Sequence, residues 1–427
     1  MDDTSTQLKN EHKEYIGLQR LLTPWRLKWY PRSLLAAIAV AFTIAVLSGN
    51  GASTLTGRLG GDYAAFYGAG RIVAKGEFGE LYNWNRQLDA QKGLFPGEEK
   101  SFLPFMNPPY VALAYLPLSL LPYRLSYVIH TLLLVGALLM TLHLIRPMNA
   151  QIDRHYLFTF TLLLFFYPVL RSVLGGQNTA LTLLLIASSW RAVEDRHEFR
   201  AGFFLGLLLF KPHFALPLIG VYVLSGRWRV GIASAITALF LYVIGVLMQG
   251  PRWVIIWFEY AKWAIQPPMG FEADKAISWL GFFKALLGVD STSALILGWT
   301  MVLGTIVGIS WIWFVGSRRA DLKAQIGLAA PCLLLIPPHV YYYDAGLLFF
   351  TYAVIITRHL KRQAELVGIV WFLGFSQILS GLIGFSPLFL VTVFTGVLAI
   401  NNLGRMAIHP KSSESLYPVY STKGHQG

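Results

Sequence analysis

The chain contains a series of apolar runs that approach or reach the length of a membrane-spanning helix. They include residues 33–48, 125–145, 230–248 and 293–315. Because an α-helix needs roughly 20 apolar residues to cross the hydrocarbon core of a bilayer, such runs are typical of transmembrane helices. Hydrophobic residues make up 55% of the 427 residues and charged residues only 13%, which is too apolar for a soluble protein. The sequence predicts an all-α polytopic membrane protein.

The distribution of lysine and arginine predicts the orientation. Segment 1–32 carries several basic residues before the first apolar run, which predicts a cytoplasmic N-terminus. Residues 110–121 are too few to cross a bilayer and are interpreted as a juxtamembrane or re-entrant helix. With this choice, most of the 35 lysine and arginine residues fall in cytoplasmic loops. We expect about twelve spans, a transmembrane domain over residues 33–402 and a cytoplasmic tail over residues 403–427.

Two long polar segments interrupt the apolar pattern, and the predicted topology places both outside the cytoplasm. The first, residues 49–110, contains Asp62 at the start of the aromatic and glycine-rich run DYAAFYGAG. The second, residues 250–292, carries large aromatic residues at helical spacing, which predicts an interfacial amphipathic helix. These aromatic residues are Trp253, Trp257, Tyr260 and Trp263.

Asp62 is the candidate catalytic residue of the first loop. A carboxylate just past the end of a membrane helix can act as a general base on a substrate held at the membrane surface. The alternative is that Asp62 caps the helix that follows it, since capping is the commoner role of such an aspartate. Tyr67, in the same run, is a candidate substrate contact.

Further polar residues occur in the motifs RSVLGGQN, KPH and PPHVYYYD, all of them on the predicted outer side with Asp62. Charged groups near hydrocarbon are costly unless they are paired or face a cavity, so these residues are functional candidates. The set comprises Arg171, Gln177, Asn178, Lys211, His213, His339 and Asp344.

Structural roles are the alternative for each of these residues. Lys211 would extend its ammonium group to the membrane interface. His339 and Asp344 would pair with each other across one turn. Gln177 and Asn178 would close a helix hairpin.

Several kinds of site are not expected. The sequence has neither a phosphate loop nor a dinucleotide-binding glycine motif, so no nucleotide-binding domain is expected. It lacks HExxH, its single cysteine is Cys332, and no second acid accompanies Asp62 in an Asp-x-Asp arrangement, so we expect no metal and no cofactor. The net charge of +13 is attributed to cytoplasmic loops that face anionic lipid, not to nucleic-acid binding.

The order and spacing of several segments carry a family resemblance. These segments are GGDYAAFYGAG, GEFGELYNW, NPPYVALAYLPLSLLP, GGQNTALTLLL, AGFFLGLLLFKPHFAL followed by GRWR, and PPHVYYYDAGLLF. Over about residues 33–360 the chain resembles glycosyltransferase family 87, a group of polyprenyl-phosphate-mannose-dependent mannosyltransferases with the GT-C fold. The chain departs from the family's usual pattern in two places: Asn107 precedes the paired prolines, and the turn before Asp344 is rich in tyrosine. Both departures concern the identity of the sugar and of the acceptor.

The resemblance implies that residues 33–402 form a GT-C catalytic domain in the cell (cytoplasmic or inner) membrane. It implies a polyprenyl-phosphate sugar donor, a glycan or glycolipid acceptor on the extracytoplasmic face, and metal-independent inverting transfer with Asp62 as the base. Lys211 and His339 are then the expected partners of the departing phosphate, followed by Arg171 and Gln177.

Two other functions remain as alternatives. The first is a transporter or flippase of lipid-linked sugars, which would also have broken helices and intramembrane charges. The second is a catalytically inactive family member that acts as a partner subunit. The long first loop and the lack of a visible internal repeat favour the enzyme over the transporter.

Overall fold

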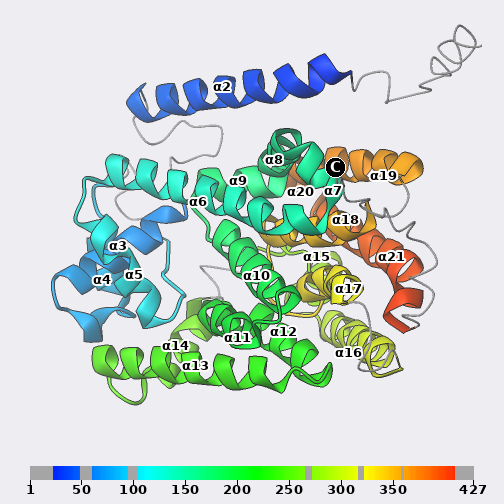
Figure 1. Cartoon of the computed structure of the whole chain (residues 1–427). Helices are drawn as coiled ribbons and strands as arrows, with labels where there is room; N and C mark the ends of the chain where they lie inside the picture. The colour runs from blue at the N-terminus through cyan, green and yellow to red at the C-terminus, as the bar shows by residue number, and fades with distance from the viewer. Residues whose placement is uncertain are drawn as a thin grey trace, which may run out of the picture.

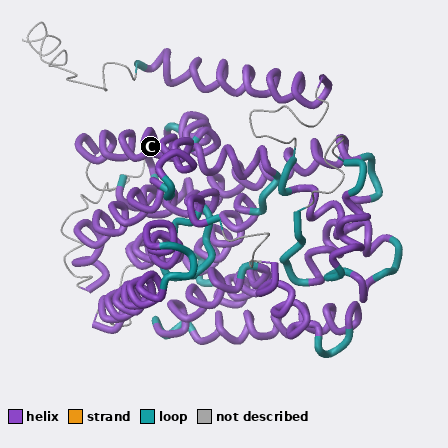
Figure 2. The backbone as a smooth tube through the Cα atoms, turned by 180° about the vertical axis from the view of Figure 1, so that it is seen from behind, coloured by secondary structure: helices purple, strands orange, loops and turns teal. Residues whose placement is uncertain are grey.

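The computed structural model of the chain describes residues 23–48, 60–94, 103–264, 272–315, 322–356 and 360–408. These residues form helices joined by loops, and they contain no strand apart from an isolated bridge between Ala276 and Tyr341 (Figures 1 and 2). The prediction of an all-α protein is therefore confirmed for the described part of the chain. Of the predicted terminal segments, residues 1–22 and 409–427 lie outside it.

Five helical segments of the described chain are long and apolar enough to cross a membrane. They lie in α2 (Pro24–Ser48), α6 (Tyr123–Ile145), α13 (Trp228–Gln249), α16 (Thr292–Val315) and the segment Glu365–Ile383, which includes most of α19 (Leu360–Leu373) and α20 (Ser380–Ile383). Shorter apolar helical segments of the described chain are α12 (Pro212–Leu224), α17 (Leu322–Leu335), the segment Tyr342–Ile355 that ends in α18 (Leu348–Ile355), and Pro387–Leu403 of α21 (Pro387–Ile408). The chain is thus a multi-pass membrane protein, and the total of about twelve spans stays a prediction.

One predicted span is bent. The apolar run over residues 156–170 predicts one rising helix, but α8 (Tyr156–Phe165) and α9 (Tyr167–Gly175) meet at an angle of 71°. Phe166 between them is extended, and Pro168 occupies the first turn of α9. Because proline has no N–H to donate to the preceding turn, it is accepted at the start of a helix but ends the helix before it. The pair counts as a sixth span if it is taken as one broken helix.

A second break falls at the KPH motif. Helix α11 (Glu198–Leu207) continues into η4 (Leu208–Phe210), and α12 begins at Pro212, so that Lys211 occupies the break. The same property of proline explains this break. It leaves the Lys211 side chain inside the helix bundle instead of on a helix surface.

The first long loop and the short helix that follows it fold into a compact group of helices at one end of the molecule (left in Figure 1). This group contains α3 (Tyr63–Ala74), η2 (Phe78–Glu80), α4 (Trp84–Gln91) and α5 (Pro109–Ser119), which share an apolar core with the start of α6. Helix α5 has 11 residues, so it is short, as expected. Residues 49–59 and 95–102 of this loop lie outside the described part.

The second long loop contains α14 (Trp253–Ala264), η5 (Ala273–Lys275) and α15 (Trp279–Leu287), and α14 confirms the predicted aromatic helix. Trp257 Nε1 donates to the backbone oxygen of Met106 at 2.8 Å, and the Tyr260 hydroxyl donates to Gln87 Oε1 at 3.1 Å. The two long loops therefore pack against each other.

Helix α10 (Thr179–Glu194) lies in the middle of the molecule (Figure 1) and contributes Leu183, Ala187 and Trp190 to the main apolar core. The remaining elements are η3 (Arg146–Met148), α7 (Ala150–Arg154), η6 (Tyr342–Leu347) and η7 (Gly374–Leu379). The N-terminal end of α10 follows directly on the GGQN motif, so the core helix holds this motif in place.

Candidate active site

Asp62 stands at the N-terminal end of α3 but does not cap it. Its backbone is already helical (φ −71°, ψ −23°), and its side chain makes no capping hydrogen bond. The carboxylate instead meets the GGQN motif. Oδ2 lies 3.2 Å from the point where a Cβ on Gly175 would be, and the Gln177 side chain hydrogen-bonds to the carboxylate. The capping alternative does not describe this side chain.

The turn that carries Gln177 is held from two sides. Gly176 ends α9 in the left-handed conformation (φ +80°), and a Cβ there would come within 2.5 Å of Tyr63 Cβ. From α6, the Tyr127 hydroxyl donates to Leu174 O at 2.6 Å, and His130 Nε2 contacts Gly176 O at 3.1 Å. The turn and the start of α3 are thus in direct contact, which fixes Gln177 beside Asp62.

Gly176→Ala is therefore expected to destabilise the protein by roughly 1–3 kcal/mol and to lower activity, because the left-handed backbone and the contact with Tyr63 both exclude a side chain. Thermal unfolding in detergent measures the effect. Gly220→Ala is the matched control, since Gly220 lies in α12 and a Cβ added there would meet nothing within 4 Å. Equal melting temperatures for the two variants would show that the turn tolerates rearrangement.

The surroundings of Asp62 raise the pKa of its carboxyl above the ordinary value. Burial is the main cause, and Glu272 adds to it. The hydrogen bond from Gln177 and the positive charges of Lys275 and Arg171 oppose the rise. A general base is most effective when its pKa lies near the working pH, so this direction suits a proton-accepting role.

The charges of Lys275 and Glu272 act on Asp62, and their loop is tied to the PPHVYYYD turn. Ile277 N donates to Val340 O at 2.9 Å, and Ser278 Oγ donates to Pro338 O at 3.3 Å. Lys275 also forms an ion pair with Glu272. Sequence reasoning missed Lys275, since one lysine in a long polar loop has no pattern that separates it from the others.

Arg171 is the second cation whose charge acts on Asp62. It lies on α9 one turn before Gly175, so the two residues share a face of the helix. Its Nε donates to the Tyr342 hydroxyl at 3.4 Å, and the Tyr342 ring stacks on that of Tyr167 at 6.2 Å. Arg171 is therefore positioned between α9 and η6, beside the candidate base.

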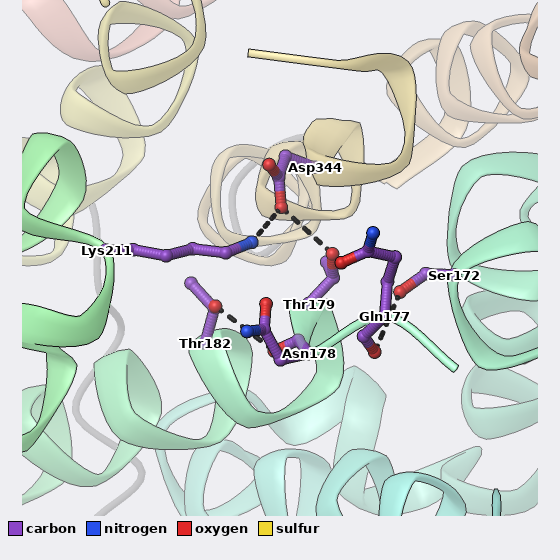
Figure 3. A network of polar contacts seen from close by, with 7 residues as sticks. All are labelled: Ser172, Gln177, Asn178, Thr179, Thr182, Lys211 and Asp344. Atoms are coloured by element: carbon purple, nitrogen blue, oxygen red, sulfur yellow. Dashed lines mark hydrogen bonds and ion pairs between the residues drawn. The ribbon is translucent and has the colours of Figure 1, made fainter. Parts of the chain in front are cut away.

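Lys211 and Asp344 form a buried ion pair (Figure 3). Lys211 Nζ lies 2.6 Å from Asp344 Oδ1, and the Thr179 hydroxyl donates to the same oxygen at 2.9 Å. Lys211 is 8% exposed and Asp344 is 4% exposed. Lys211 therefore does not extend to the interface, and the ion-pair partner of Asp344 is Lys211, not the His339 of the structural alternative. Together with Thr179, the first residue of α10, the ion pair links the break before α12 to η6.

The remaining candidates lie around this cluster. Burial lowers the pKa of His339 to about 4, although Asp344 opposes the shift, so the ring is neutral at neutral pH and can serve only as a hydrogen-bonding group. His213 packs its ring on Phe214 at 4.2 Å. The Tyr67 hydroxyl donates to Leu121 O at 2.8 Å, which is a structural contact inside the first-loop helices.

Metal-ligand chemistry is sparse here. Within residues 23–408, apart from the gaps given above, no three or more histidine, cysteine or acidic side chains are grouped so as to hold a metal ion.

Asn178 differs from the other candidates, because its Oδ1 atom is buried and has no hydrogen-bond partner among the described residues.

Comparison with known proteins places this architecture in a family. A search of the curated proteins and a search of the solved structures found no match. The family model for glycosyltransferase family 87 matches residues 105–338, more than half of the chain. The matched region includes the GGQN turn, the Lys211 break and the second loop with Lys275. This multi-pass membrane protein belongs to glycosyltransferase family 87.

Proposed function

We propose that the protein transfers mannose or a similar hexose from a polyprenyl phosphate to a glycan or glycolipid on the extracytoplasmic face, within a GT-C architecture. One observation carries the proposal: the uncapped, half-buried Asp62 carboxylate held by Gln177, with Arg171 and Lys275 close enough to act on it. A base beside two cations is what transfer from an anionic leaving group requires.

In this mechanism Asp62 takes the proton of the acceptor hydroxyl while the hydroxyl oxygen attacks the anomeric carbon of the donor sugar. The bond between that carbon and the phosphate oxygen breaks, and the phosphate departs with the electron pair. Attack from the side opposite the phosphate inverts the configuration. Gln177 orients the carboxylate through its hydrogen bond, and proton transfer of this kind contributes about 10²–10⁴-fold to the rate.

The departing phosphate is assigned to Arg171 and Lys275. Lys211, the cation favoured by the sequence, pairs with Asp344 at 2.6 Å and is buried in the bundle. Lys275 is also paired, with Glu272, but that pair lies at the surface, where a phosphate can replace the carboxylate. Arg171 suits phosphate well, because a guanidinium group presents a planar set of donors. Lys211 then supports the site by holding η6 against α10.

Arg171→Ala and Lys275→Ala are each expected to lower kcat/KM for the donor by about 10–100-fold, the loss typical of a charge-assisted hydrogen bond. Initial rates at varied donor concentration measure this. Lys262→Ala, an exposed lysine on α14 of the same loop, should leave kcat/KM unchanged. If both site variants keep wild-type kcat/KM, the phosphate is bound elsewhere.

The function itself is tested with purified protein in liposomes, radiolabelled polyprenyl-phosphate mannose and a lipid extract from the host. We expect the radiolabel of the donor to appear in a new product, which remains when the polyprenyl-phosphate compounds have been removed. A transporter would instead move the labelled donor between the leaflets and form no new glycosidic bond. An inactive partner subunit would do neither.

A further inference from the structure

A cavity of about 420 Å³ lies between α5, α10, the α11–η4 segment and α13. Almost all of its wall is apolar, and none of its lining residues is charged. The apolar wall includes Val111, Ala114, Leu181, Leu185, Leu207 and Leu241. We call this cavity the α10 groove.

The α10 groove adjoins the apolar outer surface of the molecule. Leu113, on its α5 side, is 38% exposed. On α13, the lining residues Leu241 and Ile244 alternate with the outward-facing Val243 and Leu247, which are exposed. Because α13 has the length and composition of a membrane span, this surface is expected to face lipid. A hydrocarbon chain can therefore enter the groove from the bilayer.

Two residues that line the groove each carry a buried polar atom without a partner in the described part of the chain. Asn178 Oδ1 and the Tyr115 hydroxyl have no hydrogen-bond partner among the described residues, although Asn178 is only 3% exposed and Tyr115 only 7%. Buried polar atoms are costly to leave unpaired, so unpaired atoms in a native structure call for an explanation. The asparagine oxygen accepts and the tyrosine hydroxyl donates, so together they match a neutral head group that carries hydroxyl groups.

This polar end borders the candidate active site. Asn178 follows Gln177, whose side chain bonds to Asp62. The Tyr115 ring lies 6.2 Å from that of Tyr63, the residue after Asp62. Arg171 and Lys275 act on Asp62 but do not line the groove, so the donor phosphate and the groove have different polar partners.

We propose that the α10 groove binds the hydrocarbon chain of a lipid acceptor and that Asn178 and Tyr115 hydrogen-bond its uncharged head group. This inference rests on the proposed function and narrows the acceptor to a glycolipid. A polyprenyl phosphate is the less suitable occupant, because the groove offers no cation for its head group.

Photolabelling tests the proposal without requiring turnover. The probe is a 16-carbon alkyl glycoside with a diazirine midway along its chain, and cross-links are mapped by peptide mass spectrometry. We expect labels on the groove-facing peptides of α10 and α13, and competition by the unlabelled glycoside but not by an equal concentration of polyprenyl phosphate. Stronger competition by polyprenyl phosphate, or labelling only outside the groove, would overturn the proposal.

Matched variants show whether labelling is lost because the groove is filled or because the protein unfolds. Ala114→Trp places a large ring in the groove and should abolish this labelling, whereas Ala235→Trp, on the exposed side of α13, should not. Tyr115→Phe should weaken labelling about fivefold, as expected for one hydrogen bond, without lowering the Tm. A sugarless hexadecane diazirine should be unaffected by Tyr115→Phe. Equal affinity of the glycoside for wild type and Tyr115→Phe would refute the head-group assignment.

The two proposals fail in different ways. Groove labelling in a protein that never transfers sugar from polyprenyl-phosphate mannose would refute the proposed function alone. Transfer to a glycolipid without groove labelling would refute the groove alone.

Discussion

Asp62→Asn is expected to lower the rate of sugar transfer by about 10²-fold or more while leaving the fold intact, because an amide cannot take the acceptor's proton. The Asp62→Asn variant should also be more stable than the wild type at neutral pH. Burial raises the pKa of the native carboxyl, so the native state binds this proton more tightly than the unfolded state does. Ionised Asp62 therefore destabilises the wild type above its native pKa, and the advantage of asparagine shrinks as the pH falls from that pKa to the ordinary value.

Asp89→Asn provides the matched control for this experiment. Asp89 lies on α4 of the same loop and is exposed, so its replacement should change neither the Tm nor the rate. Thermal unfolding and transfer are measured on one preparation of each variant. An Asp62→Asn protein that unfolds at a much lower temperature than wild type would show that the carboxylate is structural.

Breaking the buried ion pair should have the largest effect on stability. Asp344→Ala is expected to cost about 3–5 kcal/mol, because it leaves the Lys211 ammonium buried without a counter-charge. The double variant Lys211→Met/Asp344→Leu removes both charges and should recover most of the loss, since apolar replacements of buried pairs are often neutral. Denaturation midpoints in detergent measure the difference.

The same variants test which cation serves the donor. If Lys211 has only the supporting role assigned here, the double variant should keep a donor KM close to that of the wild type. A double variant that folds normally but loses donor binding would show that Lys211 binds the donor phosphate. Lys211→Met alone would then show the same loss of donor binding.

Local chemistry made part of this structure predictable. The break at Lys211 and the short α5 follow from proline and from segment length, and the aromatic spacing predicts the helix of α14. Asp62 was recognisable from its place after the first apolar run. Proline chemistry also explains the bend between α8 and α9, but the unbroken apolar run around Pro168 is a stronger signal of one continuous span.

The contacts that complete the site could not be predicted in this way. Lys211 and Asp344 are 133 residues apart, and only tertiary packing selects each as the partner of the other over His339 or lipid. Lys275 depends on the contact of Ile277 with Val340, which joins two loops. The lack of a hydrogen-bond partner for Asn178 Oδ1 and the Tyr115 hydroxyl can be recognised only from the positions of all the possible partners.

The pH dependence of transfer by the wild type and by Asp62→Asn, in the same liposome preparation, tests the role of Asp62 most directly. The wild-type rate should fall on acidification with an apparent pKa above the ordinary aspartate value, because burial favours the protonated carboxyl. The residual rate of Asp62→Asn should show no such fall. A variant that keeps more than about a tenth of the wild-type rate, or that shows the same acid limb, would contradict general-base catalysis by Asp62.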